Sequence, residues 1–367
     1  MCPNQGLYKG AISMSSMSEI CQQRSHRKYV IVFSGDLPDV SLEEVKGILE
    51  GYNIKYRIIY KDSYVGILET EDLRDIRVGH RFSLIKILSE FLGIYSSINE
   101  VIERVKKISH IFSGRKFYVR VFKFGSTWSR IVDSVSLSKR IGEIILANSD
   151  AKVNFSSPDI ILHVYMSNKI ILGIPREFRA DKMLTRRPSR RPYSKPVSMD
   201  PRIAKAMINM ARVREGDRVL DPFCGTGAIL VEAGLMGMRV LGSDISDEMI
   251  IGTLKNLEYF GIKPEKIVKC DVREINNYFS EVDAIVCDPP YGRAASTYGE
   301  SLEKLYHESF AVFREVLKRG RYAVVCFSDP HYHYKIGAKY MRLISVVSYR
   351  VHKSLTRHIG IYKNVQG

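Results

Sequence analysis

Short, mostly apolar runs alternate with helix-length segments throughout the C-terminal half of the chain. Four of these runs end in an acidic residue, namely Asp221, Asp244, Asp271 and Asp288. Runs of this length and composition are typical of strands buried on both faces of a sheet. Strands and helices in regular alternation predict a parallel sheet, and the four carboxylates would then meet at its carboxyl edge.

Further elements are predicted on either side of these four runs. A helix should begin after Asp200, a typical N-cap residue that is followed by proline. Apolar residues at helical spacing predict a helix over 302–313, and the next apolar run predicts a strand over 322–327. An antiparallel pair over 343–351 and 358–363 would complete a sheet of seven strands.

The N-terminal half has the pattern of a mixed α+β region. Strands are predicted over 29–33, 56–60, 64–68, 117–122, 160–166 and 169–174, and helices over 41–50, 82–92 and 137–148. The helix over 82–92 is expected because its apolar residues recur at intervals of three and four. The second and third strands should form a hairpin, and nothing before residue 80 indicates chemistry.

Length and composition exclude several classes of protein. A chain of 367 residues can form two or three domains. It contains no apolar run close to the ~20 residues that span a bilayer, and residues 1–27 do not resemble a secretory signal. We therefore expect a soluble, cytoplasmic protein with an unstructured start. The six cysteines show no Cys-x-x-Cys spacing and the histidines lack nearby ligands, so no metal site is expected.

The chain is strongly basic, with 56 Lys and Arg against 40 Asp and Glu and a formal net charge of +16. This balance favours a polyanionic partner, with nucleic acid ahead of an acidic membrane surface. Basic residues are dense in the segment 176–196, which also contains three prolines. A semi-rigid basic arm suits contact with a phosphate backbone, although a plain charged tether would have the same composition.

The fourth of the apolar runs, Val282–Cys287, leads into Asp288-Pro-Pro-Tyr291. The two prolines end the strand and hold the backbone extended. Asp288 and the carbonyl of Pro289 can then accept the hydrogens of an exocyclic amine, while Tyr291 stacks on the ring that carries it. Accepting these hydrogens localises the nitrogen lone pair and makes the amine a nucleophile. Asp-Pro-Pro is also ordinary turn chemistry, so the catalytic interpretation depends on the other strand-end acids.

The first acidic run leads into a glycine-rich turn, Asp221-Pro-Phe-Cys-Gly-Thr-Gly227. Glycines let a ligand approach the backbone and leave N–H groups at the helix start available to it. The spacing differs from the dinucleotide fingerprint Gly-x-Gly-x-x-Gly. It resembles motif I of S-adenosylmethionine-dependent methyltransferases. The resemblance implies donor contacts from Asp221, Pro222, Cys224, Gly225, Thr226, Gly227, Asp244, Ile245, Asp271, Val272 and Asp288, with Asp244 on the ribose and Asp271 on the adenine.

The N-terminal half carries a second resemblance. The segments Phe117-Tyr-Val-Arg-Val, Arg140-Ile-Gly and Lys152-Val-Asn-Phe-x-x-Pro-Asp-Ile160 are spaced as in a THUMP domain, an RNA-binding module of tRNA-modifying enzymes. With the Asp-Pro-Pro-Tyr type of motif IV and the segment His352–Arg357, the chain resembles the archaeal tRNA guanosine-10 N2-methyltransferases. This resemblance implies transfer of one or two methyl groups from S-adenosyl-L-methionine to the guanine 2-amino group of tRNA.

The resemblance also implies a division of the chain. We expect a ferredoxin-like unit over 28–79, a THUMP domain over 80–175, a basic linker over 176–196 and a Rossmann-like methyltransferase domain over 197–367. A monomer is favoured. The expected RNA contacts are Arg120, Lys123, Arg186, Arg187, Arg190, Arg191, Lys353 and Arg357.

Some alternatives stay open on the sequence alone. The loop Ala294–Thr297 departs from the family pattern, which leaves the shape of the guanine pocket and the number of methyl groups undecided. The chain could instead act on an rRNA guanine, or on an amino group of DNA. It could also be a non-catalytic RNA-binding protein with a decayed methyltransferase fold.

Overall fold

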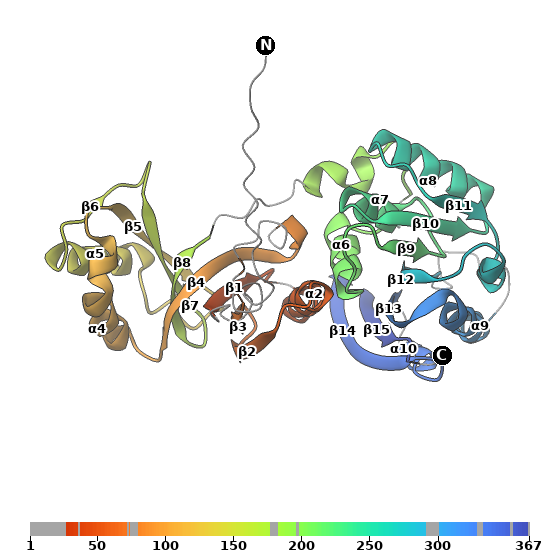
Figure 1. Ribbon diagram of the computed structural model, residues 1–367. Coiled ribbons are helices and arrows are strands. Elements are labelled where there is room, and N and C mark those ends of the chain that lie inside the picture. Colours follow the sequence, from red (N-terminus) through yellow and green to blue (C-terminus); the bar gives the residue numbers. More distant parts are fainter. Residues whose placement is uncertain are drawn as a thin grey trace, which may run out of the picture.

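The computed structural model describes residues 27–35, 37–71, 73, 80–176, 183–195, 198–290, 301–328, 333–352 and 355–365. These residues form two β-sheets with helices packed against them, one sheet in each half of the chain (Figure 1). The segment 1–27, predicted to be unstructured, lies outside the described residues except for Arg27. No helix in the described residues is long and apolar enough to cross a membrane.

The sheet of the N-terminal half has, among the described residues, eight strands in the order β2-β3-β1-β4-β8-β7-β5-β6. Its elements are β1 (Arg27–Phe33), α2 (Pro38–Gly51), β2 (Tyr56–Lys61), β3 (Val65–Thr70), β4 (Ile85–Tyr95), α4 (Ile98–Ile108), η1 (Ser109–Phe112), β5 (Lys116–Lys123), α5 (Ser134–Ala147), β6 (Lys152–Val153), β7 (Ile160–Met166) and β8 (Ile170–Pro175). Helix α2 packs on the end formed by β1 and β3, and α4 and α5 pack on the end formed by β5 and β7. The hairpin of β2 and β3 confirms the predicted pair.

The helix predicted over 82–92 is wrong, because this segment contains most of strand β4. The strand pairs with β1 along one side and with β8 along the other, so it joins the two ends of the sheet. The pairing shifts register between Phe91 and Gly93 and opposite Val32 and Phe33. Each shift breaks the two-residue alternation of a strand, and the apolar residues then recur at intervals that resemble a helix.

The C-terminal half contains a seven-stranded sheet, counted over the described residues, in the order β11-β10-β9-β12-β13-β15-β14. Its elements, with the segment that precedes it, are η2 (Met183–Arg186), η3 (Pro188–Arg190), α6 (Pro201–Met210), β9 (Arg218–Asp221), α7 (Ala228–Leu235), β10 (Arg239–Asp244), α8 (Asp247–Tyr259), β11 (Lys266–Lys269), η4 (Val272–Asn277), β12 (Val282–Cys287), α9 (Leu302–Val316), β13 (Leu317–Phe327), α10 (Tyr334–Gly337), β14 (Arg342–His352) and β15 (Leu355–Lys363). The pairs among β9 to β13 are parallel, and β15 is antiparallel to both neighbours.

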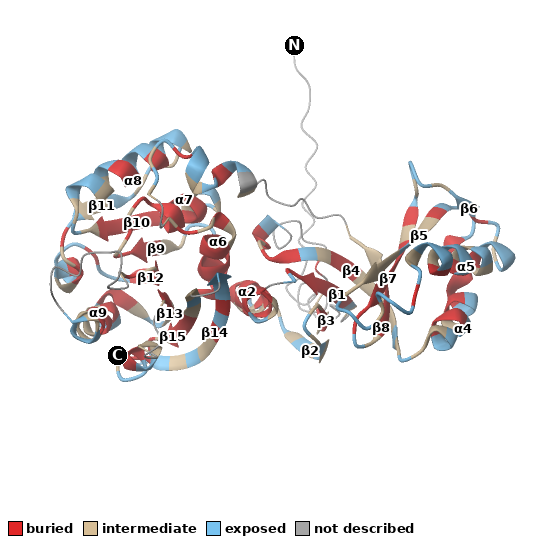
Figure 2. Cartoon of the chain, turned by 180° about the vertical axis from the view of Figure 1, so that it is seen from behind, coloured by how far each residue is buried: buried red, intermediate tan, exposed pale blue. Residues whose placement is uncertain are grey.

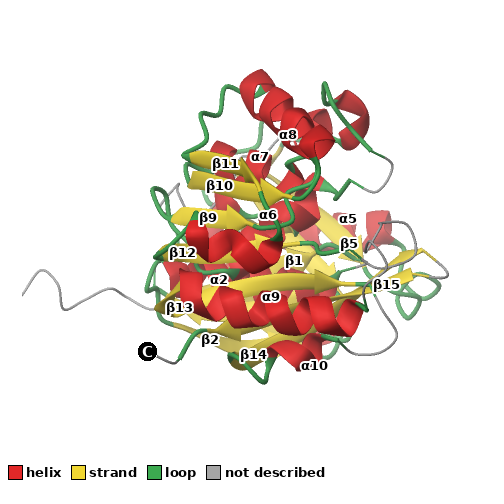
Figure 3. Ribbon diagram, turned by 90° about the vertical axis from the view of Figure 1, so that its right-hand side faces the viewer, coloured by secondary structure: helices red, strands yellow, loops and turns green. Residues whose placement is uncertain are grey.

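Both faces of this second sheet are covered by helices. Alternate residues of β9 and β12 point to opposite faces, so Val219 packs with α6 and α7 whereas Leu220 packs with α9. Figure 3 shows α9 in front of the sheet, and Figure 2 shows that the strands are largely buried. The result is a three-layer α/β fold with a mostly parallel central sheet, as the alternating pattern predicts.

The two halves are joined through helices α2 and α6. The helices approach so closely that a Cβ atom on Gly47 would lie 2.2 Å from the carbonyl oxygen of Asn209. The Asn209 amide nitrogen donates to Glu44 at 2.9 Å, and its oxygen accepts from Arg81 at 2.9 Å. Arg81, Glu44 and Asn209 are all buried. A fully buried polar network therefore spans the junction of the two halves.

Candidate active site

The four predicted acids follow four adjacent strands of the C-terminal sheet. Asp221 and Asp244 are the last residues of β9 and β10, while Asp271 and Asp288 come just after β11 and β12. Because these strands are parallel, all four residues lie at the carboxyl edge, where ligands bind in open α/β sheets. The sequence prediction of a shared edge is confirmed.

The glycine-rich turn between β9 and α7 has a backbone that other residues could adopt only with strain. Gly225 has φ 51° and Gly227 has φ 78°, both in the left-handed region. Thr253 donates to the carbonyl of Gly225 at 2.8 Å, and Asn256 donates to the carbonyl of Thr226 at 2.8 Å. Side chains of helix α8 thus hold the backbone of the turn in place.

Asp244 is held by this same turn. The backbone N–H of Gly225 donates to one carboxylate oxygen at 2.9 Å, and that of Ser246 donates to the other at 2.9 Å. Burial raises the pKa of Asp244, and these backbone hydrogen bonds oppose that shift. The carboxylate therefore has a fixed orientation beside the turn. Ile245, the next residue, is exposed at the same edge.

Asp221 is buried, with 2% of its surface exposed. Burial raises its pKa well above the ordinary value, and the neighbouring charges of Asp288 and Asp244 raise it further. Its carboxylate accepts from the backbone N–H of Phe223 at 3.1 Å, and no Lys or Arg of the described residues forms an ion pair with it. A buried carboxylate of this kind is stabilised when a cation binds beside it.

The other residues predicted to hold a donor occupy the same edge. Pro222, Cys224, Thr226 and Val272 are buried, and the hydroxyl groups of Thr226 and Ser198 lie 3.1 Å apart. Asp271 caps η4 and forms an ion pair with Arg273 at 2.6 Å, and these contacts lower its pKa. Sequence reasoning missed Arg273, and the signal for it was a basic residue two positions after an N-cap acid, where its side chain can fold back onto the carboxylate.

Asp288 interacts with two neighbouring side chains, those of Arg357 and Cys326. Its Oδ2 atom accepts from Arg357 at 3.3 Å, while Oδ1 is buried and has no hydrogen-bond partner among the described residues. Burial raises the pKa of Asp288 to about 6, against the opposing effects of the Arg357 guanidinium and the Cys326 side chain. Pro289 is buried, and the next carbonyl, that of Pro290, accepts from the Tyr306 hydroxyl at 3.2 Å. Tyr291 lies outside the described residues.

Three of the arginines predicted to contact RNA are engaged inside the protein: Arg186 and Arg191 are buried and Arg357 is half-buried, so the structure leaves them poorly placed for such a contact. Arg186 forms a two-pronged ion pair with Glu232, with both distances at 2.8 Å. Arg191 is 7% exposed and donates to the carbonyl of Arg186. Arg357 faces Asp288. Charge alone does not separate buried from exposed arginines, but an acid inside the apolar helix 228–235 was a signal that Glu232 needs a partner.

The remaining predicted RNA contacts differ in exposure. Arg187, Arg190 and Arg120 are exposed. Arg120 lies over the Phe122 ring, 5.1 Å from its centroid. Lys123 is half-buried and donates to the carbonyl of Val132 at 2.7 Å, which leaves it less available. Lys353 lies outside the described residues.

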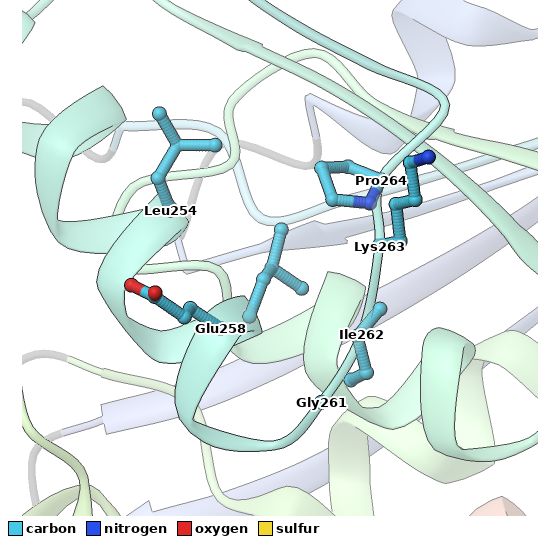
Figure 4. Close-up of a pocket in the computed structure, with 7 residues that line it drawn as sticks. Leu254, Glu258, Gly261, Ile262, Lys263 and Pro264 are labelled. Carbon is cyan, nitrogen blue, oxygen red and sulfur yellow. The ribbon is translucent and has the colours of Figure 1, made fainter.

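Two hollows elsewhere on the surface have no part in this site. The first is lined by residues of α8 and the turn that follows it, including Leu254, Glu258 and Pro264 (Figure 4). It lies where α8 leads back to the start of β11, away from the carboxyl edge. The second is lined by Glu50, Arg212 and Tyr322 at the junction of the two halves. Within the described residues no group of three or more potential metal ligands is found.

Comparison with known proteins agrees with this arrangement. A family described as "RMKL-like, methyltransferase domain" matches residues 188–359, which include all four strand-end acids. A family described as DNA methylase matches residues 82–255, a range that ends before Asp271 and Asp288. Among solved structures, TrmN from Thermus thermophilus covers 92% of this chain and 99% of its own at TM-score 0.52 and 18% identity. SMU.472, a putative methyltransferase complexed with SAH, gives TM-score 0.54 at 12% identity over 94% of this chain and 100% of its own. At these identities both show a shared fold.

Relatives of similar length are closer in sequence. The tRNA (guanine(10)-N2)-dimethyltransferase of Methanothermobacter thermautotrophicus is 33% identical over 92% of this chain and 99% of its own length. The protein of the same name from Methanocaldococcus jannaschii is 34% identical over 91% of this chain and 99% of its own. With about nine-tenths of this chain aligned, these matches extend over both halves of it. The chain therefore belongs to the family of archaeal tRNA (guanine(10)-N2)-dimethyltransferases.

Proposed function

We propose that this protein transfers one or two methyl groups from S-adenosyl-L-methionine to the exocyclic N2 amine of guanosine-10 in tRNA. The family supports the reaction class and the substrate, and the names of the relatives favour two transfers. The observation that carries the proposal is Asp288 Oδ1, a buried acceptor atom without a hydrogen-bond partner in the described part of the chain. Such an atom is costly in a folded protein unless a ligand hydrogen meets it.

The residues at the carboxyl edge fit the donor. Asp221 offers a buried negative charge for a cationic ligand, and Gly225 and Gly227 leave room at the backbone beside it. Asp244 would accept from the ribose hydroxyls, with Ile245, Asp271 and Val272 around the adenine. Pro222, Cys224 and Thr226 would shape the turn. When bound, the donor supplies an electrophilic methyl group on a positively charged sulfur.

Asp288 and Pro289 would act on the acceptor. The carboxylate and the Pro289 carbonyl accept the two amine hydrogens of guanine, which localises the nitrogen lone pair for attack on the methyl group. Catalysis of this kind depends mostly on positioning, so no strong base is needed before the new bond forms. The proton is lost late, to Asp288 or to water. Tyr291 would stack on the guanine once the nucleotide has left its helix.

The N-terminal half would hold the tRNA. We propose the division into a ferredoxin-like unit over 28–79, a THUMP domain over 80–175, a linker over 176–196 and a methyltransferase domain over 197–367. Exposed arginines on two of these parts, Arg120, Arg187 and Arg190, would contact phosphates without reading sequence. The full-length relatives favour tRNA over the rRNA and DNA alternatives, and the intact acids argue against a decayed site. We expect a cytoplasmic monomer.

The test uses three versions of one tRNA. The first is an unmodified transcript with guanosine at position 10, and the second carries inosine there and so lacks only the 2-amino group. The third has already been methylated once at N2. After incubation with S-adenosyl-L-methionine, nuclease fragments are mapped by mass spectrometry. We expect methylation at position 10 of the first and third and none of the second. Methylation of the inosine tRNA, or of another position, would show that the proposed target is wrong.

A further inference from the structure

Arg357 reaches the active site from two strands away. It lies on β15, which is separated from β12 by β13 in the sheet. Its Nη1 atom lies 3.3 Å from Asp288 Oδ2, and 11% of its side chain is exposed. Directly opposite Arg357 in the antiparallel pair is Tyr349 of β14, whose hydroxyl interacts with the guanidinium. The side chain is therefore directed under the edge of the sheet rather than toward solvent.

This placement does not suit an RNA contact. A phosphate would have to reach a guanidinium that is already buried between Asp288 and Tyr349. The titratable groups around Asp288 explain what the arginine does there. They are Asp221 on β9, the thiols of Cys287 and Cys326 on β12 and β13, Tyr349 on β14 and Arg357 on β15. Of the groups that interact with Asp288 in the described residues, Arg357 is the cationic one.

We infer that Arg357 is a positioning residue for methyl transfer: it holds Oδ2 of Asp288 and leaves Oδ1 to accept from the guanine amine. The inference rests on the proposed function, because the acceptor amine belongs to that reaction. Two consequences follow from the geometry. The hydrogen bond fixes the rotation of the carboxylate, and the positive charge keeps the carboxylate ionised in a buried place. A protonated Asp288 could not accept hydrogen bonds from both Arg357 and the guanine amine in this way, since one of its oxygens would itself carry a hydrogen.

The test compares Arg357→Met with Arg350→Met. Arg350 is exposed and lies on the paired strand near the same end, opposite Thr356, so its loss removes an equal charge from the same region. We expect Arg357→Met to lower kcat for methyl transfer about 10- to 100-fold, because misplaced reacting groups cost rates of this order. The KM for tRNA and its salt dependence should stay as in the Arg350→Met variant. Arg357→Lys should recover part of kcat, since it keeps the charge but not the geometry.

Two further measurements separate positioning from a merely structural role. The pH below which kcat/KM falls should move upward in Arg357→Met, because the carboxylate then holds its proton to higher pH. In an Asp288→Asn background, Arg357→Met should have little additional effect on the residual single-turnover rate or on the unfolding temperature, since its partner is already neutral. The double variant, Asp288→Asn with Arg357→Met, can also be used if Arg357→Met alone folds poorly, because the double variant leaves no unpaired buried charge.

The outcomes are distinct. Equal kcat values and equal pH profiles for Arg357→Met and Arg350→Met would overturn the inference while leaving the proposed function intact. A raised KM and a weaker salt dependence at unchanged kcat would instead make Arg357 an RNA contact. If the wild type does not methylate tRNA, the proposed function fails first. The pair can then still be tested by NMR titration of carbon-13-labelled aspartate, in which Arg357→Met should raise the pKa of Asp288.

Discussion

Asp221 ends strand β9 and Asp288 follows the neighbouring parallel strand β12, and their carboxylates repel each other at the carboxyl edge of the sheet. Burial raises the pKa of both, that of Asp288 to about 6. Arg357 compensates Asp288, whereas Asp221 has no ion pair among the described residues. Two buried acids in this arrangement destabilise the ligand-free protein. They favour binding of a cationic ligand between the glycine-rich turn and β12.

Replacing Asp221 by asparagine should stabilise the protein at neutral pH. The folded-state pKa of Asp221 lies above its ordinary value of 3.8, so its contribution to stability falls as pH rises above that value. We expect Asp221→Asn to raise the free energy of unfolding by about 1–3 kcal/mol at pH 7.5, with little difference below pH ~4. Urea denaturation at the two pH values measures this. Added S-adenosyl-L-methionine should raise the unfolding temperature of the wild type but not that of the variant.

Asp271→Asn provides a control with the opposite sign. The pKa of Asp271 is lowered by Arg273, so its ionised form adds stability above the ordinary value of 3.8 and loses it as pH falls. This variant should therefore be less stable than the wild type at pH 7.5. If Asp221→Asn is also destabilising at that pH, the assignment of Asp221 as an uncompensated buried charge is wrong.

The rate of methyl transfer should depend on the ionisation of Asp288. Since its pKa is raised to about 6, the carboxylate is ionised above that pH and protonated below it. We expect kcat/KM to be flat above pH ~7 and to fall about tenfold per pH unit well below 6. A bound sulfonium favours the ionised form, so kcat should fall at a lower pH than kcat/KM. Measured at constant ionic strength, a profile that stays flat down to pH 5 would contradict this role.

The buried network between the two halves predicts a large loss of stability for Asn209→Ala. The substitution removes donors from Glu44 and from the carbonyl of Arg81 and an acceptor from Arg81. Because Glu44 and Arg81 would stay buried, we expect a loss of about 2–4 kcal/mol in the free energy of unfolding. Asn276→Ala, at an exposed residue bonded to Glu315, should change it by less than about 0.5 kcal/mol. Similar losses for the two variants in urea denaturation would show that the network contributes little.

The linker arginines should separate into two groups. Replacing the exposed pair Arg187 and Arg190 by glutamine should weaken tRNA binding and reduce the slope of log K against log salt by about 1–2. Replacing Arg186 by glutamine should instead cost about 3–5 kcal/mol of stability, because Glu232 would be left as a buried charge. Binding titrations at several salt concentrations and urea denaturation measure the two effects. An unchanged salt slope would make the linker a tether.

The C-terminal fold could be predicted from the sequence because four of its strands are short, mostly apolar and end at or just before an acid. Alternation of strand and helix then leaves few arrangements, and the edge that collects Asp221, Asp244, Asp271 and Asp288 follows from the parallel pairing. Strand β4 could not be predicted in the same way. It is apolar on both faces and its register shifts twice, so its pattern has no period of two.

Only those residues of the candidate site that belong to local sequence motifs could be predicted. Asp288 and the glycine-rich turn are recognisable from their neighbours in the chain. The partner of Asp288 is 69 residues away on another strand, so no local pattern indicates it. Arg186 and Arg357 have the same charge in the sequence as exposed arginines, and only the packing around them shows that they pair with Glu232 and Asp288.

The central claim is that the Asp288 carboxylate activates the guanine amine. Its most direct test is the single-turnover rate of Asp288→Ala on a tRNA with guanosine at position 10, with both substrates saturating. We predict that the variant binds this tRNA with nearly wild-type affinity and forms no methylguanosine at position 10. Transfer at a rate comparable to that of the wild type would contradict the account.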